Sequence, residues 1–270
     1  MTKKLIKTIW VFAFAFSNIL AFAQFGGGDG LSEATAYQIS TVKHLEELSD
    51  SVNIDSYPNW SYGKYFKVMN DITDGLTRPI GYAYGYVNHQ LFQGYFDGQG
   101  YRISLAIDSN MIFLNAGLFA GLMSGTVIKN VVVDGYVKAA HLAGGIAGGF
   151  AMPDPAIITN CINMANITSN IAGGIVGGVI IAATMNVTIE NCINVGTIQG
   201  SSIAGGIVGF TILSTITNCI NNGFIRGNLA GGIAGGIGGN TTISKCFNSG
   251  VVSGNSSVGC IVGLNNGAAL

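Results

Sequence analysis

Four cysteines occupy the same place in four similar segments of the chain. The segments ITNCINM, IENCINV, ITNCINN and ISKCFNS contain Cys161, Cys192, Cys219 and Cys246. Thiols at a repeated position could form disulfides, bind a metal ion or act as nucleophiles, or they could fill a core as small apolar side chains. The elements that carry them decide between these chemistries.

Carboxylates are the other side chains in this sequence that could do chemistry. A glycoside hydrolase or a lyase needs clustered acids, or acids beside Lys or Arg, on one face. From residue 139 onward the ionisable side chains are few and fall at different places in different repeats: Asp154, Glu190, Arg226, Lys245 and His141. This scatter predicts no catalytic site in that half of the chain.

The first half holds more ionisable candidates, namely Asp71, Asp74, Arg78, His89, Asp97 and Arg102. Asp97, in FDGQG, could be a carboxylate ligand or a base, but Asp-Gly is a common turn pair and favours an Asx-type turn. NDITDG could hold calcium through several oxygens, yet its spacing matches no EF-hand loop, which favours a solvated turn. The histidines have no partner at metal-ligand spacing and are expected to be surface residues: His44, His89 and His141.

A glycine-rich hexamer recurs at a period of about 28 residues. AGLFAG begins at residue 116, AGGIAG at 143, AGGIVG at 172 and 204, AGGIAG at 230 and VGCIVG at 258. Each cysteine precedes the next hexamer's first glycine by 12 or 13 residues, whereas the distance from that glycine to the next cysteine varies from 14 to 19. Insertions therefore gather in one segment of each repeat, as at one corner of a solenoid.

The repeats have the chemistry of short strands. No segment after residue 60 shows a sustained apolar stripe of period 3.6, and each interior glycine costs a helix about 1 kcal/mol relative to alanine. We therefore predict an all-β fold, a single-stranded parallel β-helix with about 28 residues per turn. A membrane reading of the GxxxG spacing at Gly173 and Gly177 fails because the apolar run is too short to span. In-register stacking also fits a functional amyloid, but the long repeat with variable loops favours an intramolecular stack.

The first residues have the pattern of a signal peptide. Lys3, Lys4 and Lys7 precede an apolar run from Ile9 to Ala23 that ends in AFA, so segment 1–23 is predicted to be removed on export. The run is short of the ~20 apolar residues of a membrane span, so no stable span is expected after removal. The rest has 9 basic and 13 acidic side chains, a net charge of −4, and no basic run. This composition gives no support for nucleic-acid binding or polybasic membrane docking.

Segment 24–60 is predicted to contain a strand, ATAYQIS, and a capping helix. Ser40 or Thr41 could N-cap this helix, which would run to Asn53 with apolar residues on one face: Val42, Leu45, Leu48 and Val52. A solenoid needs such a cap to cover its first rung. Segment 61–115 is expected to form the first turns, with strands in 65–73 and 92–107 and DGQG as a turn. Segment 116–270 contains the hexamer repeats.

Asparagines repeat with the cysteines. Two residues after each cysteine stands an asparagine, at Asn163, Asn194, Asn221 and Asn248. These could form a side-chain amide ladder or present a polar face to glycans, and the ladder is favoured. The cysteines would stack about 4.8 Å apart with parallel side chains, so their Cβ atoms would lie farther apart than the ~3.8 Å a disulfide prefers. We therefore interpret them as buried core residues, a place that Val131 takes in the first repeat.

At these residues the sequence resembles the GLUG-motif family of bacterial exported repeat proteins. The hexamers, together with GDGLSEATAYQIST, YFKVMNDIT, RPIG and FQGYFDGQGYRIS, carry a resemblance that covers residues 28–264. It implies a right-handed β-helical module of the kind found in surface and adhesin-like proteins and beside IgA-cleaving metallopeptidases. It transfers no catalytic residue, because the HExxH of those peptidases is missing and His44 begins only HLEEL.

These patterns predict an exported, non-enzymatic module on the outer cell surface, a stalk or adhesin-like scaffold without catalytic, cofactor-binding or metal-binding residues. Its partners would be a glycan or a host or cell-surface protein, bound at the variable-loop corner through Phe150, Met152, Pro153, Pro155, Ile180 and Met185. One alternative is a carbohydrate-active enzyme, in which Asp71, Asp97 and another acid would converge within ~5–10 Å. Another is a piece of a longer surface protein, whose uncapped last rung after VGCIVG would favour end-to-end self-association.

Overall fold

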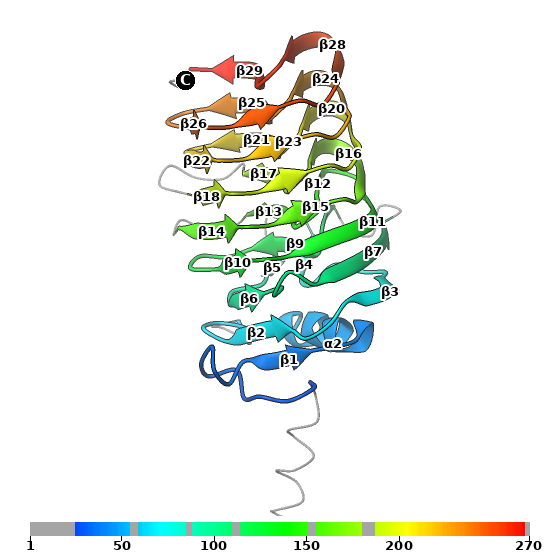
Figure 1. Cartoon of the computed structure of the whole chain (residues 1–270), viewed down its shortest axis with the longest axis vertical. Coiled ribbons are helices and arrows are strands. Elements are labelled where there is room, and N and C mark those ends of the chain that lie inside the picture. The colour runs from blue at the N-terminus through cyan, green and yellow to red at the C-terminus, as the bar shows by residue number, and fades with distance from the viewer. Residues whose placement is uncertain are drawn as a thin grey trace, which may run out of the picture.

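The chain coils into a parallel β-solenoid, seen in a computed structural model that describes residues 25–54, 59–84, 88–109, 114–150, 155–179 and 187–267. It makes about seven turns of about 29 residues each, close to the predicted 28, and the coil is right-handed (Figure 1). The predicted parallel β-helix is therefore confirmed. The predicted signal peptide, 1–23, lies outside the described residues, and the predicted domain limits stay predictions.

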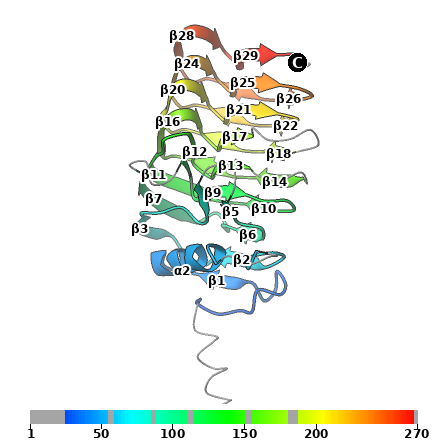
Figure 2. The ribbon, with the colours of Figure 1, turned by 180° about the vertical axis from the view of Figure 1, so that it is seen from behind.

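Three parallel sheets run along the coil. Sheet A consists of β1 (Tyr37–Ile39), β2 (Tyr65–Val68), β6 (Tyr95–Asp97), β10 (Val127–Lys129), β14 (Ala156–Thr159), β18 (Val187–Glu190), β22 (Ser214–Thr217) and β26 (Thr242–Ser244). Sheet C lies on the far side (Figure 2) and consists of β9 (Phe119–Leu122), β13 (Ala147–Phe150), β17 (Val176–Val179), β21 (Val208–Ile212), β25 (Ala234–Gly238) and β29 (Val262–Asn266).

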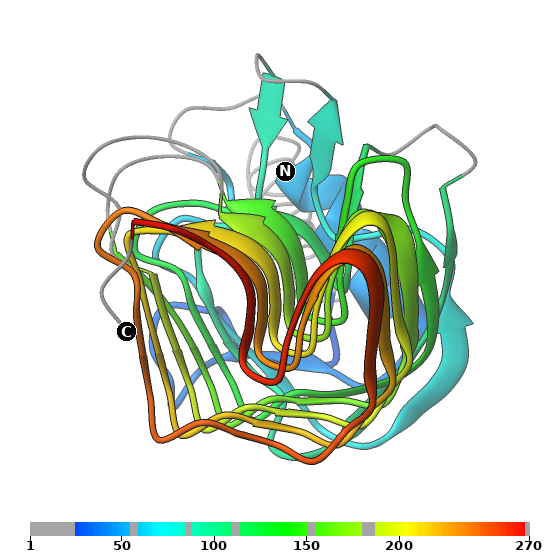
Figure 3. The same ribbon diagram turned by 90° about the horizontal axis from the view of Figure 1, so that it is seen from above.

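Sheet B joins the other two and bends within each turn. It consists of β3 (Ile72–Leu76), β7 (Arg102–Asp108), β8 (Asn115–Ala116), β11 (Val132–Lys138), β12 (Leu142–Gly144), β15 (Ile162–Asn163), β16 (Asn166–Gly173), β19 (Ile193–Asn194), β20 (Ile198–Gly205), β23 (Ile220–Asn221), β24 (Ile225–Gly231), β27 (Phe247–Asn248) and β28 (Val252–Gly259). An antiparallel hairpin, β4 (Tyr82–Tyr84) and β5 (Asn88–Gln90), leaves the coil near its N-terminal end (Figure 3). The sequence analysis did not predict this hairpin.

Equivalent residues of successive turns stand in register, so each inward position forms a continuous column. In sheet A, Ile158, Ile189 and Ile216 are paired in sequence and have no exposed surface. Their neighbours on either side point to solvent, as the period of two along a strand requires. The column places one apolar side chain per turn in the core and leaves the outward positions free to vary.

The hexamer glycines let the chain fold back into the coil. Viewed along the axis, each turn has a deep inward bend between sheets B and C (Figure 3). A Cβ on Gly173, the first glycine of its hexamer, would overlap the carbonyl oxygen of Val176, and one on Gly174 would overlap that of Gly206. The bend therefore requires glycine because backbone meets backbone there. The period predicted the turns but not this inward bend.

The predicted asparagine ladder is present inside the coil. Nδ2 of Asn194 donates to Oδ1 of Asn221 at 2.7 Å and to the carbonyl of Gly196 at 3.1 Å. Its Oδ1 accepts from Nδ2 of Asn163 at 2.7 Å and from the backbone N–H of Gly196 at 3.2 Å. The same pattern continues from Asn221 to Asn248. Every amide in the buried part of the ladder is thus satisfied, as buried polar groups must be.

The repeated cysteines fill the core, as predicted. Cys161, Cys192 and Cys219, the buried thiol column, have no exposed surface and form no disulfide. Each thiol lies 3.2–3.3 Å from the carbonyl two residues earlier. Burial raises the pKa of the Cys192 thiol well above its usual value, and a hydrogen bond to Cys192 is the main cause that raises the pKa of Cys219 to about 12. Cys246, in the last described turn, is half-buried.

The residue before each cysteine turns a corner in the left-handed conformation. Asn160, Asn191 and Asn218 have φ of 53–55°, and Asn130 and Lys245 occupy the same position in other turns with φ of 55° and 54°. Asparagine tolerates this region better than most residues, which explains its recurrence there. These corner asparagines therefore have a conformational role that differs from that of the buried ladder.

The N-terminal end of the coil has an aromatic core and a helix. Helix α2 (Val42–Val52) begins after Thr41, whose hydroxyl accepts from the backbone N–H of His44 at 3.3 Å, and ends at Asn53. Leu45, Leu48 and Val52 are fully buried in the main core. They pack at the end of the coil with the aromatic side chains of Phe25, Tyr37, Trp60, Phe66, Phe92, Phe96 and Phe119. The predicted helix and its N-cap are confirmed.

The insertions predicted from the spacing all connect sheet C to the following strand of sheet A. They lie between β13 and β14, β17 and β18, β21 and β22, and β25 and β26. The variable segment thus corresponds to one corner of the coil, as predicted. Helices of the described residues are too short and too polar to cross a membrane.

Candidate functional site

The outer face of sheet A carries two columns of side chains near the N-terminal end of the coil. Tyr65, Tyr95 and Val127 pair in register, and Ile157 follows them on β14; we call these four residues the apolar column. Lys67, Asp97 and Lys129 pair in register two residues farther along the same strands and form the charged column. Outward residues do not serve the core, so these columns need another explanation.

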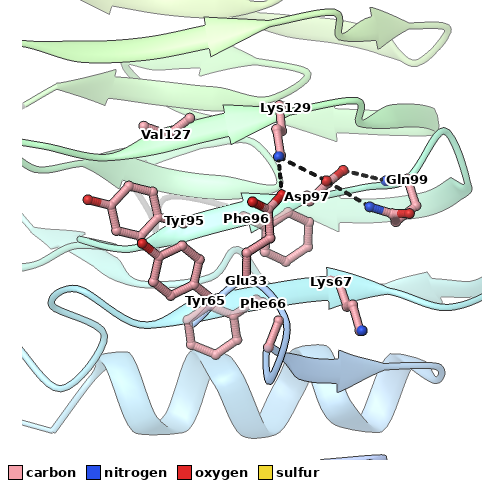
Figure 4. A pocket seen from close by; sticks show the side chains of 11 residues that line it. Glu33, Tyr65, Phe66, Lys67, Tyr95, Phe96, Asp97, Gln99, Val127 and Lys129 are labelled. Carbon is pink, nitrogen blue, oxygen red and sulfur yellow. Dashed lines mark hydrogen bonds and ion pairs between the residues drawn. The ribbon is translucent and has the colours of Figure 1, made fainter. Parts of the chain in front are cut away.

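A loop crosses this face and turns it into a cleft. Residues 29–36 form a tight loop in which the backbone N–H groups of Asp29 and Gly30 donate to the carbonyl of Thr35 at 3.0 and 2.9 Å. The carbonyl of Gly30 accepts from the N–H of Tyr65, which fixes the loop beside β2. The loop side chain of Glu33 reaches across to β10 (Figure 4). The cleft has a volume of about 440 Å³.

Two stacked tyrosines form one wall of the cleft. The rings of Tyr65 and Tyr95 are 4.4 Å apart between centroids and inclined by 12° (Figure 4). The next residue of the apolar column is Val127, whose side chain is shorter than that of tyrosine. Tyr95 is 36% exposed and Ile157 37%. An aromatic face beside polar groups is the usual composition of a small-ligand site.

An ionic cluster forms the opposite wall. The ammonium of Lys129 lies 2.6 Å from Oε1 of Glu33 and 3.3 Å from Oδ2 of Asp97. Asp97 also accepts from the N–H and the side chain of Gln99 at 2.9 and 2.7 Å, and from Nδ2 of Asn130 at 2.9 Å. The Asx-type turn predicted at Asp97 is therefore present. The ionic contacts and the position of Asp97 inside the cleft were not predicted.

The pKa of Asp97 shows the balance of forces in this cluster. Burial of the carboxyl is the largest single influence and raises its pKa, but hydrogen bonds from Asn130, Gln99 and Lys129 together outweigh burial, and the pKa is lowered. The hydrogen bond to Glu33 is the main cause that raises the pKa of Lys129. In this cluster two carboxyl groups thus contact one ammonium.

The other ionisable candidates lie in separate places. Asp71 accepts from the backbone N–H of Arg102 at 2.9 Å, and the Arg102 side chain lies 3.5 Å from Asp134. Arg78 pairs with Asp50 of helix α2 at 2.7 Å. Asp71 and Asp97 therefore take part in different clusters, and the acid that shares a contact with Asp97 is Glu33. Within the described ranges no three His, Cys, Asp or Glu side chains are placed to hold a metal ion.

The remaining predicted residues that the structure describes lie away from the cleft cluster: Asp74 is exposed on β3, and His89 belongs to β5 of the hairpin. Nδ1 of His44 accepts from the N–H of Ser40 at 3.1 Å, beside the N-cap of the helix, and His141 is partly exposed. Of the residues predicted to bind at the variable corner, Pro155 is exposed and Phe150 ends β13. The remaining ones lie outside the described residues: Met152, Pro153, Ile180 and Met185.

The sequence contained a signal for the cleft that its repeats concealed. Tyr65 and Tyr95 are 30 residues apart, one turn, and Lys67, Asp97 and Lys129 follow one another at 30 and 32 residues. The first turns lack the cysteine and the doubled glycine that mark the later repeats, so these two markers do not reveal the turns that carry the cleft. Glu33 could not be found this way because its loop belongs to no repeat.

Comparison with known proteins identifies the fold. No family model matches the sequence, and a search of curated proteins finds no match. A similar solved structure is that of a putative immunoglobulin A1 protease from Bacteroides ovatus, with a TM-score of 0.64 and 21% identity. The match covers 90% of this chain and 77% of the other chain. At this identity the likeness shows the fold alone: this chain is a parallel β-solenoid similar in architecture to that protein.

Proposed function

We propose that this chain is an exported, non-enzymatic binding scaffold of the outer cell surface, an adhesin-like module of GLUG type, and that the cleft on sheet A is its ligand site. The observation that carries the proposal is the stacked pair of Tyr65 and Tyr95 facing the cluster of Glu33, Lys129 and Asp97 across the cleft. Export is supported by the lysine-led apolar segment that ends at Ala23.

The chemistry of the cleft supports binding over catalysis. A general acid needs a carboxyl whose pKa is raised toward neutrality, whereas the pKa of Asp97 is lowered. Glu33 and Asp97 both contact the ammonium of Lys129, so each carboxylate is held in an ion pair. The rival carbohydrate-active enzyme needed Asp71 beside Asp97, and Asp71 instead contacts Arg102. We carry over no protease activity from the similar structure.

The position of the cleft changes the proposed binding surface. The variable-loop corner was the expected one, but the aromatic pair, the ionic cluster and the concave shape occur on sheet A. Tyr65 and Tyr95 project from rigid strands, which hold a binding geometry more accurately than loops do. We therefore place the main contact with a glycan or a surface protein at the cleft.

Binding of the mature chain to arrays of glycans and of surface proteins tests this function. Tyr95→Ala should weaken binding of the ligand by about 5- to 150-fold, because an aromatic contact of ~1–3 kcal/mol is removed. Tyr136→Ala is the matched control, since Tyr136 is an exposed tyrosine on β11 of sheet B, at 40% exposure. Equal binding by the two variants would refute the site, and turnover of a bound substrate would refute the non-enzymatic assignment.

A further inference from the structure

The outer face of sheet A continues beyond the cleft as a hydroxyl-bearing surface. Above Ile157 the apolar column gives way to threonines, one per turn, at Thr188, Thr215 and Thr242, which pair in register. The charged column continues as Thr159, Glu190, Thr217 and Ser244. These residues are partly or fully exposed. A row of aromatic, aliphatic and hydroxyl side chains thus follows the coil from the cleft toward the C-terminal end. The strands that carry it are stacked one above the other from β2 to β26 (Figure 1).

We propose that this surface binds a linear, neutral polysaccharide that lies along the coil axis, with one end in the cleft against Tyr95. This inference rests on the proposed function of the cleft and adds to it the class and direction of the ligand. Stacked strands repeat about every 4.8 Å, so the surface offers a threonine hydroxyl at each rung from β18 to β26. A polymer of similar units, laid along the axis, can repeat its contacts from rung to rung.

The side chains match the two kinds of surface that a sugar ring presents. The C–H face of a pyranose is apolar and packs on the ring of Tyr95, a residue that is 36% exposed. Its hydroxyls exchange hydrogen bonds with threonine hydroxyls, which donate and accept. Oε2 of Glu33 adds a charged acceptor at the cleft, since Lys129 contacts Oε1. Such charge-assisted bonds are the stronger ones.

The charge of this surface disfavours an anionic polysaccharide, and the backbone pairing of sheet A disfavours an extended peptide. Lys129 is neutralised by Glu33 and Asp97, and Lys67 is a second cation that lines the cleft. Above the cleft the two columns carry a single charge, that of Glu190, so cations are outnumbered on this surface. An anionic polysaccharide therefore gains little counter-charge here. An extended peptide usually adds to a sheet through backbone hydrogen bonds at an edge. The face of sheet A offers none, because its strands already pair with the turns above and below.

Calorimetric titration with neutral oligosaccharides of increasing length tests the proposal. The probes are β-linked gluco-, manno-, xylo- and N-acetylglucosamine series from disaccharide to octasaccharide, with heparin and polygalacturonate as anionic comparisons. Affinity for one neutral series should rise with length by about tenfold or more, because the added units are held at an effective concentration set by the first contact. The double variant Thr188→Ala/Thr215→Ala should lose this gain and still bind the disaccharide.

The controls separate this inference from the proposed function. Thr168→Ala, at an exposed threonine of β16 in sheet B, should keep the gain with length. A gain unchanged in the double variant, or tighter binding of the anionic polymers, overturns the proposal while a Tyr95-dependent cleft remains. A Tyr95-dependent ligand that is a protein overturns the ligand class and leaves the proposed function intact. If no ligand depends on Tyr95, both the proposed function of the cleft and the polysaccharide proposal are refuted.

Discussion

Replacement of Asn194 by alanine tests whether the amide ladder holds the coil together. Asn194 has no exposed surface and makes four hydrogen bonds, two along the ladder and two to Gly196. Alanine leaves the N–H and carbonyl of Gly196 without these partners. It also removes the single ladder bond of Asn163 and one of the two ladder bonds of Asn221. An unsatisfied buried group costs about 1–3 kcal/mol, so we expect a loss of about 3–5 kcal/mol.

That loss is large beside the 5–15 kcal/mol stability of a typical domain. Chemical denaturation gives its size, and hydrogen exchange gives its location, which should centre on the turns that contain β19 and β23 because a solenoid turn contacts only its neighbours. The control is Asn228→Ala, at an exposed asparagine of β24, which should change stability by less than about 0.5 kcal/mol.

Asn194→Asp separates hydrogen bonding from volume. The aspartate has nearly the same size, but its second oxygen would face Oδ1 of Asn221 and the carbonyl of Gly196. Burial would raise the pKa of this carboxyl, so the folded chain binds the proton more tightly than the unfolded chain. Stability should therefore be highest below the pKa of the unfolded aspartate and fall as pH rises through the folded value. If alanine costs less than 1 kcal/mol, or aspartate shows no pH dependence, the ladder is not the main support.

Three further outcomes are expected. Timed alkylation with mass spectrometry should modify the exposed Cys260 quickly and the buried thiol column only on unfolding. Because burial raises the pKa of Cys192, the free energy of unfolding should fall as pH rises above about 8.5. Asp97→Asn should lower the free energy of unfolding by about 1–2 kcal/mol at neutral pH. Because the pKa of Asp97 is lowered in the folded state, this difference between the variant and the original chain should vanish as pH falls below 3.8. A difference that stays constant with pH would contradict the prediction. Gly173→Ala should cost more than about 3 kcal/mol through overlap with backbone, whereas a Cβ on Gly238 meets first a methyl of Ile212 at 3.1 Å, and Gly238→Ala should be mild in the same denaturation assay.

The inner half of this molecule could be predicted from its sequence because the repeat amplifies each inward position. One cysteine in an exported protein suggests a disulfide, but four at one place, with Val131 as a fifth, indicate a buried column. The asparagines two residues later follow the same logic, and the ladder confirms it. A repeat thus converts weak single-residue signals into a register that specifies which side chains face the core.

The outer half could be predicted less well, for two physical reasons. Outward side chains do not pack in a shared core, so their residue types vary from turn to turn. Their arrangement in columns is therefore not visible as a repeat in the sequence. Contacts between distant segments also have no local signal: Glu33 and Lys129 are 96 residues apart and meet only because a loop crosses sheet A. The inward bend at the hexamers was missed similarly, since doubled glycines indicate close approach of backbone but not its direction.

The contrast between the two faces of sheet A is itself an argument about function. Along the inner face, the paired positions of β14, β18, β22 and β26 are all isoleucine, because one core demands one shape. Along the outer face the paired positions change from tyrosine to valine, isoleucine and threonine, although solvent alone would accept one polar residue throughout. The large apolar residues gather where the loop that carries Glu33 shelters the strands. An outward column that departs from polarity at a cleft and on the strand beside it is better explained by a ligand than by stability, and it directs the search for that ligand to Tyr95.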